Sequence, residues 1–158
     1  MIKTKYSVLP STGIQIKKKG FFKFKELYKD MKSWFDDHGY DFHEKEHSEK
    51  EKSIGKEVKI VWEAEREIDE YTKFYIKIEF FIENLRKEDN KEIGNIKITF
   101  WSNIIFDYKK KWQSSAIGKF LMHLYNNYLI KAKIFSYYEP KLKADSYALH
   151  DLAKNYFE

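Results

Sequence analysis

The sequence predicts one α+β domain built on an antiparallel sheet, and three observations lead to this fold class. The chain has 158 residues, a length typical of a single domain, so we expect residues 1–158 to form one unit. Apolar and polar residues alternate in three segments, 58–67, 73–83 and 96–106, which is the period of strands with one buried face. Apolar residues also recur at helical spacing before these strands and after them.

The first twenty residues predict a strand, a turn and a second short strand. Residues 6–8 and 14–16 alternate between apolar and polar, and Pro10-Ser11-Thr12-Gly13 is typical of a turn. We expect the second strand to end in the run Lys17-Lys18-Lys19-Gly20. An amphipathic helix is predicted over 21–38, with Gly39 just past its last turn, where a left-handed cap residue is favoured.

The middle of the chain predicts a meander of strands. The charged stretch 44–52 predicts a loop or an exposed hairpin end. The three alternating segments that follow have short connections, and short connections imply antiparallel neighbours.

Two helices are predicted at the C-terminal end, both packed on the sheet. The first is capped by Ser114 or Ser115, and Pro140 is expected to end it because the residue before a proline avoids the helical region. We expect its apolar stripe to face the core; the stripe consists of Ile117, Phe120, Leu121, Leu124, Tyr125 and Tyr128. The order of strands, helix, meander and long helix is analogous to helix-grip folds, in which a curved sheet wraps a helix and leaves a cavity.

Composition excludes several classes of site. The chain has no cysteine, so disulfides, thiolate metal sites and cysteine nucleophiles are excluded. We find no apolar run that would serve as a signal peptide or a membrane span, and we expect a cytoplasmic protein. The net charge is +5, from 30 basic and 25 acidic residues that are mostly interleaved, which favours a solvated surface of mixed charge.

Two segments carry a resemblance to known proteins. They are the run 61–74, VWEAEREIDEYTKF, and the series Asp107-Tyr108, Trp112, Phe120-Leu121 and Tyr125. On these residues the chain resembles an uncharacterised family of small archaeal proteins, with a similar order of elements over most of its length. The resemblance implies an archaeal, cytoplasmic protein; it implies no activity, no ligand and no catalytic residue.

The sharpest chemical motif is His43-Glu44-Lys45-Glu46-His47, which matches the H-E-x-x-H pattern of zinc proteases. That chemistry needs a helix, which holds the two imidazoles on one face. The residues before the motif instead predict a strand, in which four residues span roughly 13 Å and two imidazoles are too far apart to share a metal. We therefore favour a charged hairpin and predict no metal site, no cofactor and no catalytic residue.

A basic and aromatic segment gives a candidate nucleic-acid surface, formed by Lys17, Lys18, Lys19 and Phe22. Lysines neutralise phosphates and exposed rings stack on bases. The alternative is that the rings enter the core and the lysines are solvated, and the same alternatives apply to Lys109-Lys110-Lys111. We predict that any nucleic-acid binding is weak and non-specific.

Two polar residues are candidate anchors for a ligand between the sheet and the long helix, Arg66 and His123. Arg66 falls in phase with the apolar residues of its strand, and a buried arginine needs a carboxylate partner, for which we expect Asp69 or Asp107, or else a bound anion.

Three function classes follow from these patterns. The first is a non-catalytic interaction or structural protein with a protein partner or a second copy of itself, because apolar residues such as Tyr75, Phe81 and Trp101 lie on the second face of the predicted sheet. The second is a module that binds a small apolar ligand. The third is an enzyme, and only the H-E-x-x-H match supports it.

Overall fold

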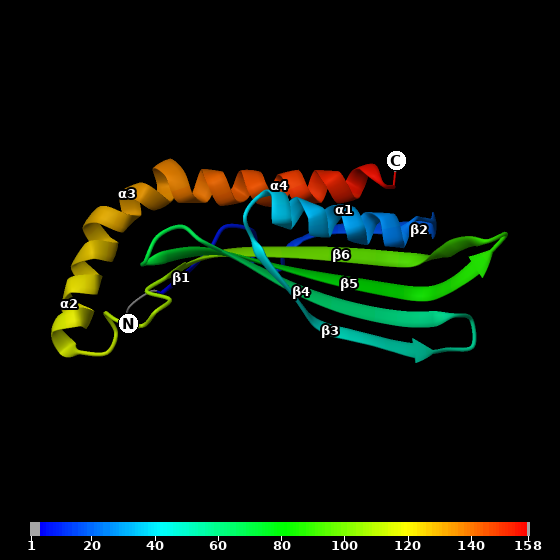
Figure 1. Cartoon of the computed structure of the whole chain (residues 1–158), viewed down its shortest axis with the longest axis horizontal. Helices are drawn as coiled ribbons and strands as arrows, with labels where there is room; N and C mark the ends of the chain where they lie inside the picture. Colours follow the sequence, from blue (N-terminus) through cyan, green and yellow to red (C-terminus); the bar gives the residue numbers. More distant parts are fainter. Residues whose placement is uncertain (1–3, 158) are drawn as a thin grey trace.

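A computed structural model describes residues 4–157 and confirms an α+β fold with an antiparallel sheet (Figure 1). The strands run in the order β1-β6-β5-β4-β3, and β2 also pairs with β6. Their bounds are β1 Lys5–Ser7, β2 Ile14–Phe21, β3 Asp41–Glu51, β4 Lys56–Glu67, β5 Thr72–Glu88 and β6 Lys91–Phe106. The predicted meander is therefore present as β3 to β6.

β1 and β2 share one neighbour, because both pair with β6, one after the other along its length. Tyr6 of β1 lies opposite Ile104, and Ile14 of β2 lies opposite Phe100. β2 does not end at the lysine run, as the sequence suggested, but continues to Phe21. Backbone bonds to β6 hold this edge strand, and such bonds are compatible with exposed lysine side chains.

The charged stretch predicted as a loop or an exposed hairpin end is part of a strand, since β3 runs to Glu51. β3 is the other edge of the sheet and pairs only with β4. Charged side chains are common on edge strands, where they discourage pairing with other chains. Of the two predicted alternatives, the exposed hairpin is therefore present and the loop is not.

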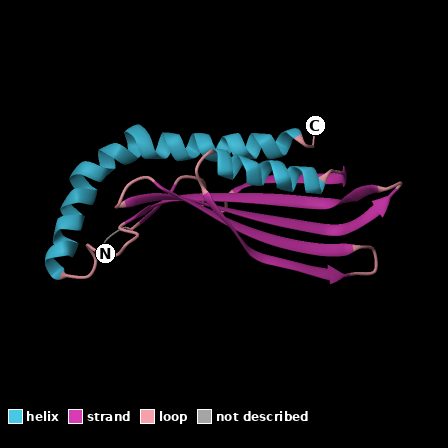
Figure 2. Cartoon of the chain, in the orientation of Figure 1, coloured by secondary structure: helices cyan, strands magenta, loops and turns pink. Residues whose placement is uncertain are grey.

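Helices cover one face of the sheet and leave the other face bare (Figure 2). α1, Phe24–Asp37, and α4, Glu139–Asn155, lie over the same face and contact each other. The large fully buried side chains lie in this layer and are mostly aromatic or branched; they include Phe35, Trp62, Phe74, Phe80, Phe100, Ile60 and Ile78.

On the bare face, which no helix of residues 4–157 covers, polar side chains of the strands lie against the aromatic rings. Lys77 lies over the Trp101 ring, 5.2 Å from its centroid, and Lys97 lies over Phe81. The Tyr75 hydroxyl donates a 2.8 Å hydrogen bond to a neighbouring glutamate on β4. These rings are half-buried, so this face has less exposed apolar surface than its sequence implies.

The C-terminal region forms one uninterrupted helical path rather than two separate helices. Its elements are α2 Ala116–Tyr125, η1 Asn126–Ile130, α3 Lys131–Lys133, η2 Ile134–Tyr138 and α4. Pro140 does not end a helix, because it lies in the first turn of α4 directly after the π-helical turn η2. There the i→i−4 bond that proline cannot make is already replaced by a wider turn.

The helical path bends between α2 and α4, so α2 descends past the end of the sheet instead of lying on it (Figure 1). The two π-helical turns η1 and η2 lie at this bend, and such turns are a common cause of helix bending. Within residues 4–157 no helix is both long enough and apolar enough to cross a membrane.

Candidate functional site

The H-E-x-x-H segment lies in β3 and is extended, as predicted. Its two histidines face opposite sides of the sheet, because a β-bulge between Glu44 and Glu46 shifts the alternation. His43 lies opposite Glu63 on the bare face, and His47 lies opposite Ile60 on the helix-covered face. Among residues 4–157 no group of three or more potential ligands could hold a metal ion.

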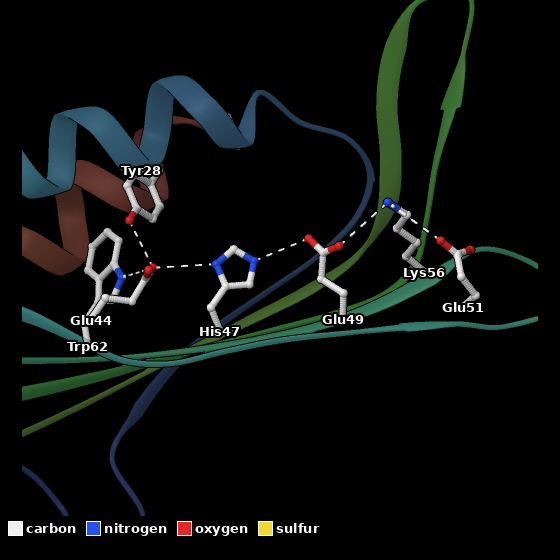
Figure 3. A network of polar contacts seen from close by, with 7 residues as sticks. All are labelled: Tyr28, Glu44, His47, Glu49, Glu51, Lys56 and Trp62. Atoms are coloured by element: carbon white, nitrogen blue, oxygen red, sulfur yellow. Dashed lines mark hydrogen bonds and ion pairs between the residues drawn. The ribbon is translucent and has the colours of Figure 1, made fainter.

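The Glu44 carboxylate is instead the centre of a polar network beneath α1 (Figure 3). One of its oxygens accepts hydrogen bonds from the Tyr28 hydroxyl at 3.0 Å and from the Trp62 indole nitrogen at 3.3 Å. His47 Nδ1 lies 3.9 Å from the same oxygen. Burial, followed by the bond to Glu44, raises the pKa of Tyr28. These contacts tie α1 to the edge strand.

The network continues along β3 as exposed ion pairs (Figure 3). His47 Nε2 lies 3.3 Å from Glu49, and Lys56 lies 3.8 Å from Glu49 and 3.7 Å from Glu51. Exposed pairs of this kind contribute about 0–1 kcal/mol each. The residues of the motif thus form a structural charge ladder, and the zinc-protease geometry is absent.

The two predicted ligand anchors are not brought together. Arg66 is half-buried near Gly39 and Tyr40, and within the described residues it makes no ion pair with Asp69 or Asp107. His123 is exposed on α2 and lies 3.0 Å from the Asn127 side chain. Neither residue lines the pocket of about 500 Å³ described below.

The candidate nucleic-acid residues are also divided. Lys17 and Lys19 are exposed on one face of β2, whereas Lys18 between them is half-buried on the other face. Phe22 is only 5% exposed and contacts Phe157 edge to face, so its ring is not available to stack on a base. For Phe22 the alternative in which the ring enters the core is therefore the one observed.

The chain leaves the sheet for α2 through a turn that Asp107 holds. Asp107 is buried, adopts a left-handed conformation, and accepts bonds from the backbone N–H groups of Trp112 and Gln113 at 3.3 and 3.1 Å. Ser115 caps α2 by accepting a bond from the Gly118 backbone N–H, as predicted. A Cβ at Gly118 would lie 2.4 Å from the Trp112 carbonyl oxygen, so only glycine permits this close approach.

Residues 116–138, called the helical arm below, pack on the sheet through one side, on which Ile130, Ile134 and Tyr138 are buried in the core. Met122 is buried, and the Tyr71 hydroxyl donates a 2.6 Å hydrogen bond to the Asn126 side chain. The Tyr125 ring packs edge to face on Tyr71 at 5.1 Å. These contacts use one side of the arm and leave the other side free.

The apolar stripe predicted to enter the core faces solvent, apart from Tyr125. Ile117 and Tyr128 are each 75% exposed and Phe120 is 62% exposed. The exposed apolar residues of the arm and of the loop before it are Trp112, Ile117, Phe120, Leu121, Leu124, Tyr128, Leu129, Phe135 and Tyr137. Periodicity identified the apolar face correctly but could not show that the bend carries it away from the sheet.

A pocket of about 500 Å³ lies where the arm meets the end of the sheet. Its lining is mainly apolar and comprises Glu70, Tyr71, Asp107, Lys111, Trp112, Leu121, Met122 and Tyr125. Burial raises the pKa of Tyr71 to about 12, so its hydroxyl stays protonated and donates. Sequence reasoning missed this site, although four of its residues, Asp107, Trp112, Leu121 and Tyr125, belong to the series on which the archaeal resemblance rests.

No protein-family model matches the chain, and a search of curated proteins finds no relative. The resemblance to small archaeal proteins therefore stays a prediction.

Proposed function

We propose that this is a non-catalytic interaction protein that docks the exposed face of its helical arm on a partner. The observation that carries the proposal is the row of apolar side chains on the arm, several of them more than half exposed. Contiguous exposed apolar surface of this kind marks interaction sites in folded proteins. Ile117, Phe120, Leu121 and Leu124 follow the i, i+3, i+4, i+7 spacing of one helix face, so they present one continuous surface.

The non-catalytic part of the proposal rests on how the chain uses its sharpest catalytic motif. The Glu44 carboxylate accepts bonds from Tyr28 and Trp62, and the two histidines of the motif lie on opposite faces of β3. A hydrolytic metal site needs both imidazoles on one ion and a glutamate free to act on water. The motif residues are occupied with joining α1 to the sheet.

A variant with Ile117→Ser, Phe120→Ser and Leu124→Ser tests the proposal. These side chains are exposed, so we expect the melting temperature to stay within a few degrees of wild type, whereas binding of a fluorescent dye specific for apolar surface falls severalfold. The matched control is Ile54→Ser, because Ile54 is 64% exposed in the β3–β4 turn, far from the arm in the chain. A large loss of stability in the arm variant would show that the face is packed and would overturn the proposal.

Self-association is the version of the proposal in which the partner is a second copy. Light scattering over a wide concentration range tests it. A dimer in wild type that becomes a monomer in the arm variant supports it, and a monomer at every concentration removes this version.

A second candidate function is binding of a small apolar ligand, and the pocket beside Trp112 favours it. Its volume of about 500 Å³ lies within the usual range for ligand sites, and tyrosine hydroxyls and Asp107 supply a few polar groups around an apolar lining. Native mass spectrometry of freshly purified protein tests this function. An adduct that Met122→Trp abolishes supports it, because a larger side chain fills the cavity; no adduct in wild type speaks against it.

A further inference from the structure

We infer that the partner of the helical arm is an anionic lipid surface, an inference that rests on the proposed interaction function. The first observation is the separation of charge along the chain. Residues 108–138 hold six lysines and no aspartate or glutamate. The remaining 24 basic residues lie among all 25 acidic residues of the chain, so the rest of the protein is close to neutral.

These six lysines lie at the surface of the protein. Lys109, Lys110 and Lys111 lie in the loop before α2, and Lys119, Lys131 and Lys133 lie on the arm; all six are exposed. None of them makes an ion pair within residues 4–157, whereas lysines on β3, β4, β5 and α4 do. The positive charge of this region is therefore available to an external anion.

The apolar face of the arm has the chemistry of a helix that lies in a lipid interface. Ile117, Leu121 and Leu124 are aliphatic, and Trp112, Tyr128 and Tyr137 supply the aromatic rings that favour the headgroup level. A helix with lysines beside such a face buries its apolar side chains in the acyl boundary while the ammonium groups reach the headgroups. At 1.5 Å per residue the ten residues of α2, which precede the bend, extend about 15 Å, long enough to lie across more than one headgroup.

Charge decides between this partner and the alternatives. A second copy would bring two arms together, each carrying exposed lysines, and the like charges would oppose the contact. Nucleic acid would match the charge, but its interfaces are polar and stack bases on rings, and they leave exposed leucine and isoleucine side chains without a role. An anionic bilayer satisfies both the lysines and the aliphatic residues.

Vesicle flotation with the full chain tests the inference. We expect strong binding to vesicles of mixed phosphatidylglycerol and phosphatidylcholine and weak binding to pure phosphatidylcholine. Each lysine near an anionic surface increases affinity roughly fivefold, so binding should fall steeply as salt is raised.

Two variants separate the charge from the apolar face. Lys119→Glu with Lys131→Glu and Lys133→Glu should abolish the preference for anionic vesicles. The matched control is Lys25→Glu with Lys29→Glu and Lys143→Glu, which changes the net charge equally at exposed positions on α1 and α4. Its loss of affinity for anionic vesicles should be severalfold smaller than that of the arm variant. The Ile117→Ser, Phe120→Ser, Leu124→Ser variant should lose binding to both kinds of vesicle.

Each other outcome identifies what has failed. Equal binding to neutral and anionic vesicles overturns the anionic surface and leaves the interaction function standing. A stable dimer that the serine variant disrupts, with no vesicle binding, likewise overturns the anionic surface and leaves the interaction function standing. Oligonucleotide binding tighter than vesicle binding identifies nucleic acid as the partner and overturns the inference. Loss of folding in the serine variant, with no dye or vesicle binding in wild type, overturns the proposed function as well.

Discussion

The Tyr40 hydroxyl donates a 2.8 Å hydrogen bond to Oδ2 of Asp145, joining the residue before β3 to the middle of α4 across 105 positions of the chain. Both residues are buried, and Lys141 Nζ lies 3.4 Å from the second carboxylate oxygen. Burial, followed by the charge of Asp145, raises the pKa of Tyr40. This contact holds α4 against the segment that leads into β3.

Tyr40→Phe should lower the free energy of unfolding by about 1–3 kcal/mol, because a buried carboxylate loses one of its donors. Chemical denaturation monitored by circular dichroism measures the change. Tyr147→Phe is the control, since Tyr147 is 38% exposed on the same helix and should change stability by less than about 0.5 kcal/mol. Equal effects of the two substitutions would contradict the assignment.

Stability should fall at alkaline pH. Burial is the first cause that raises the pKa of Tyr40, Tyr71 and Tyr75 above the ordinary value of 10.0, in the case of Tyr71 to about 12. Between pH 10 and pH 12 the unfolded chain has lost the Tyr71 proton and the folded chain retains it. The free energy of unfolding therefore decreases as pH rises through this range, and Tyr71 does not affect it below pH 10.

Urea unfolding at a series of pH values measures this dependence. Tyr71→Phe removes one of the titrating groups, so its stability should decline less steeply than that of wild type over the same range. An identical decline in the two proteins would show that Tyr71 does not contribute.

Phenylalanine-to-alanine substitution should cost much more stability in the core than on the arm. Phe74 is fully buried under the helices, and Phe74→Ala should cost about 3–5 kcal/mol because it leaves a cavity. Phe120 is 62% exposed, and Phe120→Ala should cost less than about 0.5 kcal/mol. Thermal or chemical unfolding distinguishes the two. A large loss from Phe120→Ala would place the arm in a packed interface.

Local patterns predicted the sheet well because strand alternation is a local property. Ile76, Ile78 and Phe80 alternate with charged residues and are indeed buried on one face of β5. The boundaries failed where tertiary pairing overrides local preference. The lysines of β2 continue a strand because β6 supplies backbone partners, which the local sequence does not encode.

The candidate site was harder to predict because it depends on a bend. Helical spacing placed Ile117, Leu121 and Leu124 on one face, and that grouping is confirmed. Whether such a face meets the sheet depends on the path of the helix, which the π-helical turns before Pro140 redirect. The i, i+3, i+4, i+7 spacing assumes a regular α-helix and does not account for π-helical turns.

We expect the protein to bind nucleic acid no tighter than about micromolar at physiological salt, with no sequence preference. Lys17 and Lys19 share one exposed face of β2, but Lys18 faces the other way and Phe22 is buried, so this strand offers two charges and no ring for stacking. Contact of this strand with two phosphates contributes roughly −2 to the slope of log affinity against log salt. Titration of labelled single- and double-stranded oligonucleotides measures both quantities. Lys17→Glu with Lys19→Glu should reduce the slope, and exposed Lys29→Glu should change it little. Tighter binding, or a clear preference among sequences, would make β2 a recognition surface and contradict the prediction.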